Sequence, residues 1–231
     1  MADFYALISR LVGIYGAVQK RLPGAGGRAL PPLFLVLELT YRCNLRCGFC
    51  YLRPRDGRTP DDGAGELSPD EILSVVDQTP PWTLVLLSGG EIFVRDDVFE
   101  ILRRLARKRR CHVFTNGTRI TPAAARELVE LGVSSIGVSV DGPEAVHDRL
   151  RGAGTFAAAT AALRHLAAAR ERRKRRRPLL NLKTTILPEN AGCLAESVRL
   201  AESLGADYCT FQGENTSARL GGLRLQESFD A

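Results

Sequence analysis

Three cysteines close together in the sequence are the side chains with the clearest capacity for chemistry. They are Cys43, Cys47 and Cys50, spaced CxxxCxxC directly after an apolar run. A short loop can wrap three thiolates around one metal centre, and soft thiolates select zinc, copper(I) or iron–sulfur clusters. A structural zinc site takes four ligands, whereas a [4Fe–4S] cube with three cysteine ligands keeps one iron open for a substrate. The spacing alone leaves both metals as candidates.

The other three cysteines do not extend this cluster. Cys111 and Cys209 fall in predicted strands, where we expect buried apolar thiols, and Cys193 stands at the start of a predicted helix. Six cysteines in 231 residues are too few for a disulfide scaffold. The N-terminus lacks the pattern of a signal peptide, because Asp3 precedes any apolar stretch and Arg10 interrupts it. We therefore expect a cytoplasmic protein with reduced thiols.

Six apolar, β-rich runs alternate with helical patterns and must position the cysteine loop. This alternation predicts βαβ units, a parallel sheet and so an α/β fold. Right-handed crossovers taken in order would wind the sheet into a barrel or partial barrel, and a doubly wound open sheet has the same pattern. The predicted strands are Leu33–Thr40, Thr83–Leu87, Cys111–Thr115, Ser134–Val140, Leu179–Leu187 and Asp207–Gln212. The predicted helices are Ser68–Gln78, Val98–Arg109, Thr121–Gly132, Thr155–Arg172 and Asn190–Leu204.

The segment before the sheet has a different pattern. Apolar residues recur every three or four positions over roughly residues 3–21, which predicts an amphipathic helix. Prolines and glycines in Leu22–Pro32 predict a linker. The helix would pack on the body of the protein, on a membrane surface or on a partner. We divide the chain into this helix and linker (1–32), a core (33–215) and a tail (216–231), and expect no transmembrane segment.

Small and polar residues gather where the predicted strands end. The second strand runs into Ser88-Gly89-Gly90-Glu91, the third into Thr115-Asn116-Gly117, and the fourth into Ser139-Val140-Asp141. In barrels and in doubly wound sheets the active site lies at the carboxyl ends of the strands. These residues are therefore expected to share one site with the cysteine loop.

The net charge of +6 comes from one segment of the chain. Arg170–Arg177 holds seven basic residues and one acidic residue, which leaves 25 of each sign elsewhere. We expect this run to form a solvated helix C-terminus and a loop into the fifth strand, at the end of the sheet opposite the cysteines. Nucleic acid is therefore not expected as a partner, and RNA modification through this run is an alternative.

These motifs together resemble the radical S-adenosylmethionine (radical SAM) superfamily, over roughly residues 33–215 and in the family's order. CxxxCxFC resembles its signature, and the segments at 88–91 and 115–117 resemble its second- and third-strand motifs. Residues 139–152 resemble the branch that modifies peptides and proteins. The resemblance implies a partial (β/α)6 TIM-like barrel and a [4Fe–4S] cluster on Cys43, Cys47 and Cys50. It also implies S-adenosylmethionine on the fourth iron, cleaved to a 5′-deoxyadenosyl radical that abstracts hydrogen from the substrate.

The resemblance also implies roles in binding S-adenosylmethionine. Phe49 would lie near the adenine or anchor the loop. Gly89 and Gly90 would let the backbone approach the methionine part closely. Glu91 would help to hold the methionine ammonium group through a charge-assisted hydrogen bond.

Three further residues complete the expected cofactor site. Asn116 and Ser139 would bond the ribose or the carboxylate, or else only cap their turns. Arg151 would pair with the methionine carboxylate, or else stand in solvent at a helix end. Asp141 is a weaker candidate for this cofactor site, because an aspartate before Gly142 and Pro143 also suits a turn.

The chain departs from the family pattern in two places. Ile92 stands where proline often follows the glycine motif, and no Cys-rich extension for further clusters follows the core. We therefore expect either a minimal core enzyme or a truncated one, with an open barrel end that a large substrate or a partner chain would close. The expected partners are a peptide, protein or small-molecule substrate and an electron donor such as flavodoxin or ferredoxin.

Two matters stay open at the level of sequence. Substrates are usually chosen by residues that face the barrel lumen, and the sequence does not rank Lys183, Thr185, Phe211 and Gln212. A non-catalytic zinc or cluster module that binds a partner, or an inactive remnant of the enzyme, is the alternative to a radical enzyme.

Overall fold

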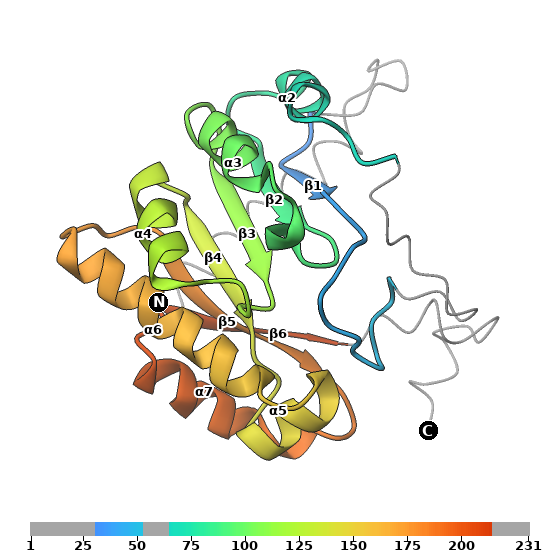
Figure 1. Cartoon of the computed structure of the whole chain (residues 1–231), viewed down its shortest axis with the longest axis vertical. Coiled ribbons are helices and arrows are strands. Elements are labelled where there is room, and N and C mark those ends of the chain that lie inside the picture. Colours follow the sequence, from blue (N-terminus) through green and yellow to red (C-terminus); the bar gives the residue numbers. More distant parts are fainter. Residues whose placement is uncertain (1–30, 53–64, 214–231) are drawn as a thin grey trace, which may run out of the picture. The chain divides into compact units, whose positions relative to one another are not determined.

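The computed structural model describes residues 31–52 and 65–213 (Figure 1). The predicted helix over residues 3–21, most of the predicted linker and the predicted tail lie outside these described residues. Within them, no helix is both long enough and apolar enough to cross a membrane.

Six parallel strands form one sheet in the order β1-β2-β3-β4-β5-β6. Each strand therefore pairs with its neighbours in the chain, without the reversal of order that a doubly wound sheet has. The sheet is a half-barrel that runs from β1 to β6, which confirms the predicted partial (β/α)6 barrel (Figure 1). Its strands are β1 (Phe34–Glu38), β2 (Leu84–Ser88), β3 (Cys111–Thr115), β4 (Ser135–Ser139), β5 (Leu179–Ile186) and β6 (Tyr208–Gly213).

The two faces of the sheet differ in what covers them. Alternate strand residues such as Val113, Ile136 and Leu182 are buried in the core beneath the helices. The residues between them, such as Phe114 and Lys183, belong to the opposite, lumen-facing side. The register pairs these lumen-facing positions across neighbouring strands, so each strand adds side chains to one shared lumen.

Helices cover the outer face of the sheet (Figure 1). Ser68 caps the first of them through a capping box, with a proline in the first turn, as its sequence predicted. Thr121 caps α4 in the same way, and Gly132 ends it in the left-handed conformation. The helices are α2 (Pro69–Asp77), α3 (Val98–Ala106), α4 (Pro122–Leu131), α5 (Glu144–Arg151), α6 (Thr155–Arg172) and α7 (Leu194–Ser203).

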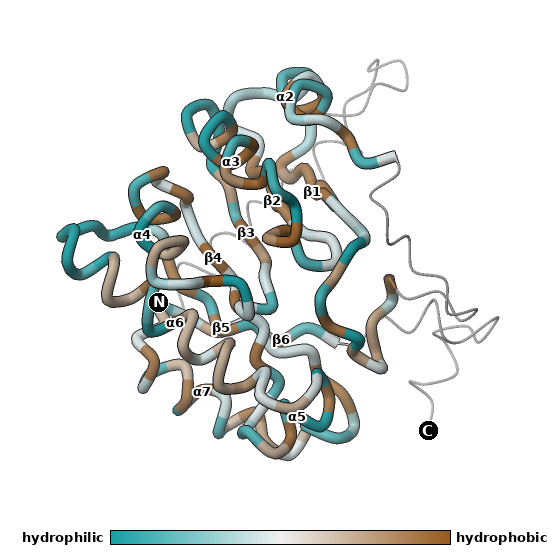
Figure 2. Tube along the Cα trace, viewed as in Figure 1, coloured by the Kyte–Doolittle hydropathy of each residue, from teal (hydrophilic) through white to brown (hydrophobic). Residues whose placement is uncertain are grey.

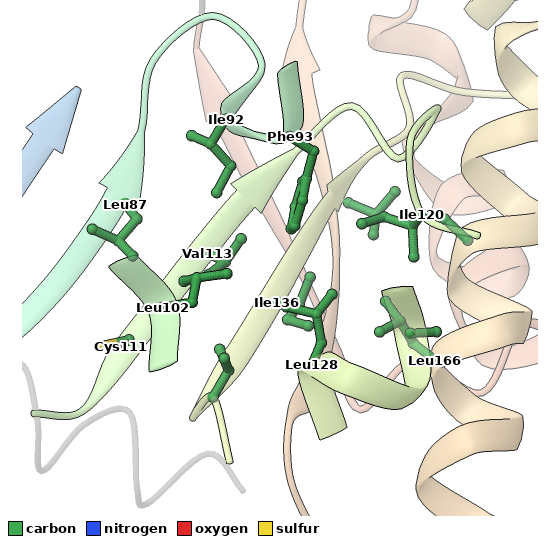
Figure 3. Close-up of a cluster of buried hydrophobic side chains, with 14 of the residues drawn as sticks. Leu87, Ile92, Phe93, Leu102, Cys111, Val113, Ile120, Leu128, Ile136 and Leu166 are labelled. Atoms are coloured by element: carbon green, nitrogen blue, oxygen red, sulfur yellow. The ribbon is translucent and has the colours of Figure 1, made fainter. Parts of the chain in front are cut away.

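A continuous apolar layer joins these helices to the strands. Figure 3 shows Leu102, Leu128 and Leu166, from α3, α4 and α6, beside Val113 and Ile136 of β3 and β4. All five side chains are fully buried. Burial of one such side chain stabilises the fold by about 1.5–3 kcal/mol, so this layer fixes the strand ends that carry the polar motifs.

Three helix predictions need correction. The helix predicted as Val98–Arg109 ends at Ala106, and the helix predicted from Asn190 begins at Leu194 after a single 3-10 turn. The short helix α5 was not predicted. Its helical pattern is brief and strongly polar, and Gly152, with φ of 121°, separates it from α6.

The basic run lies where it was predicted. It joins the end of α6 to the start of β5, at the edge of the sheet opposite the cysteine loop. Figure 2 shows this connection as hydrophilic. Arg170 pairs with Asp207 and Arg173 pairs with Glu130, so part of the run is bound within the fold.

Candidate cofactor site at the carboxyl ends of the strands

The cysteine loop follows β1 at the carboxyl edge of the sheet. Cys47 is buried, Cys50 is half-buried and Cys43 is exposed, and none of the three is in a disulfide. The Cys50 amide donates to the Cys47 carbonyl at 3.2 Å, which curls the chain between these two thiols. Burial raises the pKa of the Cys47 thiol, and the nearby Arg151 guanidinium opposes that shift. The positive charge of Arg151 thus lies near the second and third thiols of the loop.

The base of this loop rests directly on the two glycines that follow β2. The Gly90 amide donates to the Thr40 carbonyl at 2.7 Å, and the Glu91 amide donates to the Arg42 carbonyl at 2.9 Å. A Cβ atom would stand 2.3 Å from the Thr40 oxygen if added at Gly89, and 2.2 Å from the Arg42 oxygen if added at Gly90. Gly89 also has φ of 135°, which side chains rarely allow. These glycines thus permit a close backbone approach, and here the approaching segment is the cysteine loop.

The half-buried carboxylate of Glu66 also clamps this segment. Glu66 accepts hydrogen bonds from both Thr40 and Arg42, with Arg42 Nε and Nη2 each at 2.9 Å. Arg95 lies 3.3 Å from Glu66 and donates to the Leu39 carbonyl at 2.8 Å. No local pattern in the sequence predicts this clamp, because Glu66 stands 24 residues from Arg42.

The end of β3 supports the loop between its first two cysteines. Asn116 Nδ2 donates to Asn44 Oδ1 at 3.0 Å and lies 3.9 Å from Cys43 Sγ. Asn44 in turn donates to Thr118 Oγ1 at 2.8 Å. Asn116 Oδ1 also accepts from the Thr118 amide, so this side chain caps its own turn as well as touching the loop. Its predicted bond to S-adenosylmethionine stays a prediction.

Glu91 is buried completely between β2 and β3. Its carboxylate accepts from the Asn116 amide at 2.6 Å, the Thr115 hydroxyl at 2.8 Å and the Phe93 amide at 3.1 Å. Burial raises the pKa of Glu91, and these hydrogen bonds oppose that rise. The side chain ties together the two strand ends that carry the loop, and its predicted contact with the methionine ammonium stays a prediction.

A second group of charges lies where β4 ends. Arg151 Nε donates to Asp141 Oδ2 at 2.5 Å, and the Arg151 guanidinium carbon stands 5.3 Å from the centre of the Phe49 ring. Asp141 is fully buried and also accepts from the Thr185 amide at 2.8 Å. The structure thus brings together Phe49 of the cysteine loop with Arg151 of α5. Asp141 holds this arginine and is more than a turn residue.

Ser139 ends β4 on the lumen-facing side and pairs in register with Lys183 of β5. Thr185 and Gln212 form another register pair on that side, whereas Phe211 pairs with Thr184 on the helix-facing side. The expectation that Phe211 contributes to the lumen was therefore wrong. Adjacent strand residues point to opposite faces, so Phe211 and Gln212 could not both face the lumen.

A family model described as the radical SAM superfamily matches residues 37–201, which is most of the chain. The chain belongs to the radical SAM superfamily. Members of this superfamily use a [4Fe–4S] cluster together with S-adenosylmethionine.

Curated relatives extend the match over about three quarters of the chain. Pre-heme d1 synthase of Dinoroseobacter shibae is 32% identical over 184 residues, which are 78% of this chain and 43% of the relative. AdoMet-dependent heme synthase of Methanosarcina barkeri is 36% identical over 76% of this chain and 48% of the relative. Mycofactocin maturase MftC of Mycobacterium ulcerans is 35% identical over 76% of this chain and 46% of the relative. The chain spans about half the length of these relatives.

Solved structures of radical SAM proteins share the fold. Streptococcus suis SuiB bound to its precursor peptide SuiA superposes with a TM-score of 0.68 at 15% identity, covering 90% of this chain and 44% of SuiB. The protein anSMEcpe with bound AdoMet superposes with a TM-score of 0.62 at 22% identity, covering 80% of this chain and 52% of that chain.

The three thiols of the cysteine loop have the chemistry of iron–sulfur ligands. Soft thiolates select such clusters, and three of them on a [4Fe–4S] cube leave one iron open. Among the residues that the structure describes, no group of three or more His, Cys, Asp and Glu side chains is arranged to hold a single metal ion.

Proposed function

We propose that this chain binds a [4Fe–4S] cluster on Cys43, Cys47 and Cys50 and S-adenosylmethionine beside it, and uses them to remove a hydrogen atom from a peptide, a protein or a peptide-derived substrate. When bound, this pair supplies a 5′-deoxyadenosyl radical after one-electron reduction. The reductant would be a small electron carrier such as flavodoxin or ferredoxin. The observation that carries the proposal is the cysteine loop at the carboxyl ends of the strands, where its Phe49 packs on Arg151 and Asp141 holds that arginine.

The residues around the loop would bind and orient the cofactor. Arg151 uses Nε for Asp141, and its two Nη groups carry no hydrogen bond among the residues described. A guanidinium held in this way suits a carboxylate, because its remaining donors form a planar fork. Phe49 packs on the guanidinium and would limit its rotation. Ser139 lies two residues before Asp141 and would supply a hydroxyl to the same carboxylate.

The other site residues support the cysteine loop and the strand ends beside it. Gly89 and Gly90 hold the loop close to β2, and Glu91 fixes the ends of β2 and β3. Asn116 links the loop to β3. We propose that the backbone of this region meets the methionine part of the cofactor, and that the side chains mainly hold that backbone in place.

Two relatives support a peptide as the substrate. Mycofactocin maturase MftC matches the sequence, and SuiB, which was solved with a precursor peptide, matches the fold. The half-barrel leaves its lumen open between β1 and β6, among the described residues, and an open lumen suits a large substrate or a partner chain that closes it.

A heme precursor is the second candidate substrate. It is favoured by a specific observation, because two of the curated relatives are a heme synthase and a pre-heme d1 synthase, at 36% and 32% identity. Both candidates require the same cofactor site and differ in what enters the lumen.

Reconstitution with iron and sulfide under anaerobic conditions tests the proposal. After reduction, we expect an electron paramagnetic resonance signal of a [4Fe–4S]⁺ cluster that changes when S-adenosylmethionine is added, together with formation of 5′-deoxyadenosine. A cluster that ignores S-adenosylmethionine would contradict the proposal. Stoichiometric zinc without any uptake of iron would support a non-catalytic metal module instead, and salt-sensitive RNA binding through Arg170–Arg177 would support RNA as the substrate.

A further inference from the structure

Lys183 places a positive charge in the lumen without a matching negative charge. It stands on β5 and pairs in register with Ser139 of β4 and Thr210 of β6. Its Nζ lies 4.1 Å from the centre of the Phe114 ring. Among the described residues, no carboxylate forms an ion pair with this ammonium group.

The carboxylate that acts on the charge of Lys183 is already bonded to other groups. Asp141 is held by Arg151 at 2.5 Å and by the Thr185 amide at 2.8 Å. Arg151 and Lys183 together therefore bring two positive charges toward one negative charge. Burial lowers the pKa of Lys183, Arg151 lowers it further, and Asp141 acts in the opposite direction. A partly buried ammonium group in such surroundings is stabilised when an anion binds to it.

The aromatic platform beneath Lys183 is firmly packed. The Phe114 ring stands 4.3 Å from the ring of His112, measured between centres. A Cβ atom added at Gly137 would lie 3.0 Å from Phe114 Cδ1 and 3.3 Å from His112 Nε2. Glycine at 137 thus leaves the space that the Phe114 and His112 rings occupy beneath Lys183. An ammonium group held on an aromatic face keeps its N–H donors free on the side away from the ring.

We propose that Lys183 binds a carboxylate of the substrate in the barrel lumen and so selects acidic substrates. The inference rests on the proposed function, because it concerns what enters the lumen beside the cofactor. Its position supports this role: Lys183 pairs with Ser139, and Arg151 is near enough to affect its charge. A carboxylate bound there would lie next to the cofactor site, where a substrate must lie to lose a hydrogen atom. An acidic peptide and an acidic heme precursor would both meet this requirement.

Competitive labelling of lysines tests the proposal on the reconstituted protein. The chain has four lysines, Lys20, Lys108, Lys174 and Lys183, so each can be followed by peptide mass spectrometry after brief acetylation. Glutarate is the probe, and neutral glutaramide at the same ionic strength is its control. At twice its dissociation constant, glutarate should slow labelling of Lys183 about threefold. Lys108, which pairs with Asp77 on the outer surface, is the internal control and should not change.

Thermal unfolding provides a second measurement that does not need Lys183 to react. Glutarate should raise the midpoint of the wild-type protein above that in glutaramide, and this difference should disappear in Lys183→Met and return in Lys183→Arg. A Lys108→Met variant should keep the difference. Equal effects of glutarate on wild type and Lys183→Met would overturn the proposal.

Three further outcomes test this inference separately from the proposed function. If S-adenosylmethionine alone protects Lys183 and glutarate adds nothing, Lys183 belongs to the cofactor site and the proposal fails. If glutarate does not protect Lys183 but 5′-deoxyadenosine still forms, the proposed function survives and this inference does not. If glutarate protects Lys183 and no 5′-deoxyadenosine forms, this inference survives and the proposed function does not.

Discussion

The two halves of the half-barrel use their charged side chains in different ways. In the half from β1 to β3, the carboxylates of the half-buried Glu66 and the fully buried Glu91 are each surrounded by donors from the protein itself. In the half from β4 to β6, Arg151 has one ionic partner and Lys183 rests on an aromatic ring. In the first half the polar groups hold the cysteine loop. In the second half Arg151 and Lys183 keep hydrogen-bond donors available for ligands. Substitutions in the two halves should therefore differ in what they impair.

The largest effect is expected when the thiols of the first half are removed. Cys43→Ala, Cys47→Ala and Cys50→Ala combined should abolish iron uptake on reconstitution, because the cluster loses all its protein ligands. The sheet should remain folded, since the loop follows β1 and lies outside its apolar layer. Iron analysis and circular dichroism measure the two properties. Cys193→Ala is the matched control and should load normally; equal iron in the triple variant would refute the site.

The next effect concerns how closely the loop approaches β2. Gly90→Ala would put a methyl group 2.2 Å from the Arg42 carbonyl oxygen, so the loop must shift. We expect a loss of about 3 kcal/mol in the free energy of unfolding, together with reduced iron loading. Urea denaturation measures the first quantity. Gly192→Ala has open space around it and should change little, and an unaltered Gly90→Ala protein would show that the loop base is looser than described.

A smaller effect is expected in the second half and should spare the cluster. Arg151→Met should weaken binding of S-adenosylmethionine by about 2 kcal/mol, or roughly thirtyfold, because a charge-assisted contact is lost. Iron content should stay normal. Equilibrium dialysis of S-adenosylmethionine against the reconstituted protein measures this, with the exposed Arg149→Met on the same helix as control. If Arg151→Met lost iron but kept its affinity for S-adenosylmethionine, the second half would serve the cluster, which contradicts the proposed difference between the halves.

The smallest effect is expected at Glu66, and it depends on pH. Burial tends to raise the pKa of Glu66, but hydrogen bonds from Arg42 and Thr40 outweigh it, so the pKa is lowered from 4.5. A carboxylate with a lowered pKa in the folded state stabilises the protein above its unfolded pKa, and this contribution is lost as the pH falls through the folded value.

Glu66→Gln should therefore cost about 1–2 kcal/mol at neutral pH and lose less stability than wild type below pH 4.5. Unfolding curves measured from pH 7 downward would show the two proteins converging. Parallel curves would mean that the Glu66 clamp contributes no linked protonation. Glu127→Gln, in an exposed pair with Arg103, is the control and should follow wild type at every pH.

Much of this architecture could be predicted from local patterns. The apolar runs predicted all six strands to within two residues at each end, because the helix-facing side chains of the strands form one buried apolar layer. The cysteine motif and the glycine motif are contiguous in sequence, so they were visible. The helix α5 was missed because polar residues dominate its eight positions.

Contacts between distant residues were beyond such patterns. Glu66 is 24 residues from Arg42 in the sequence. Lys183 of β5 meets Phe114 of β3 across the intervening strand β4. Such contacts depend on how the strands and loops are arranged in space, and a single sequence does not specify that arrangement. The face assigned to Phe211 was a different kind of error, since alternation along a strand already excludes it from the side of Gln212.

The order of strands in the sheet has a consequence for synthesis of the chain. Because β1 to β6 are adjacent in the order in which they are made, every contact described for the cysteine loop with Glu66, Gly90, Asn116 and Thr118 is encoded before residue 119. Asp141, Arg151 and Lys183 leave the ribosome later. The nascent chain thus delivers a complete support for the thiols first, and the charges that would receive cofactor and substrate arrive on a frame already in place.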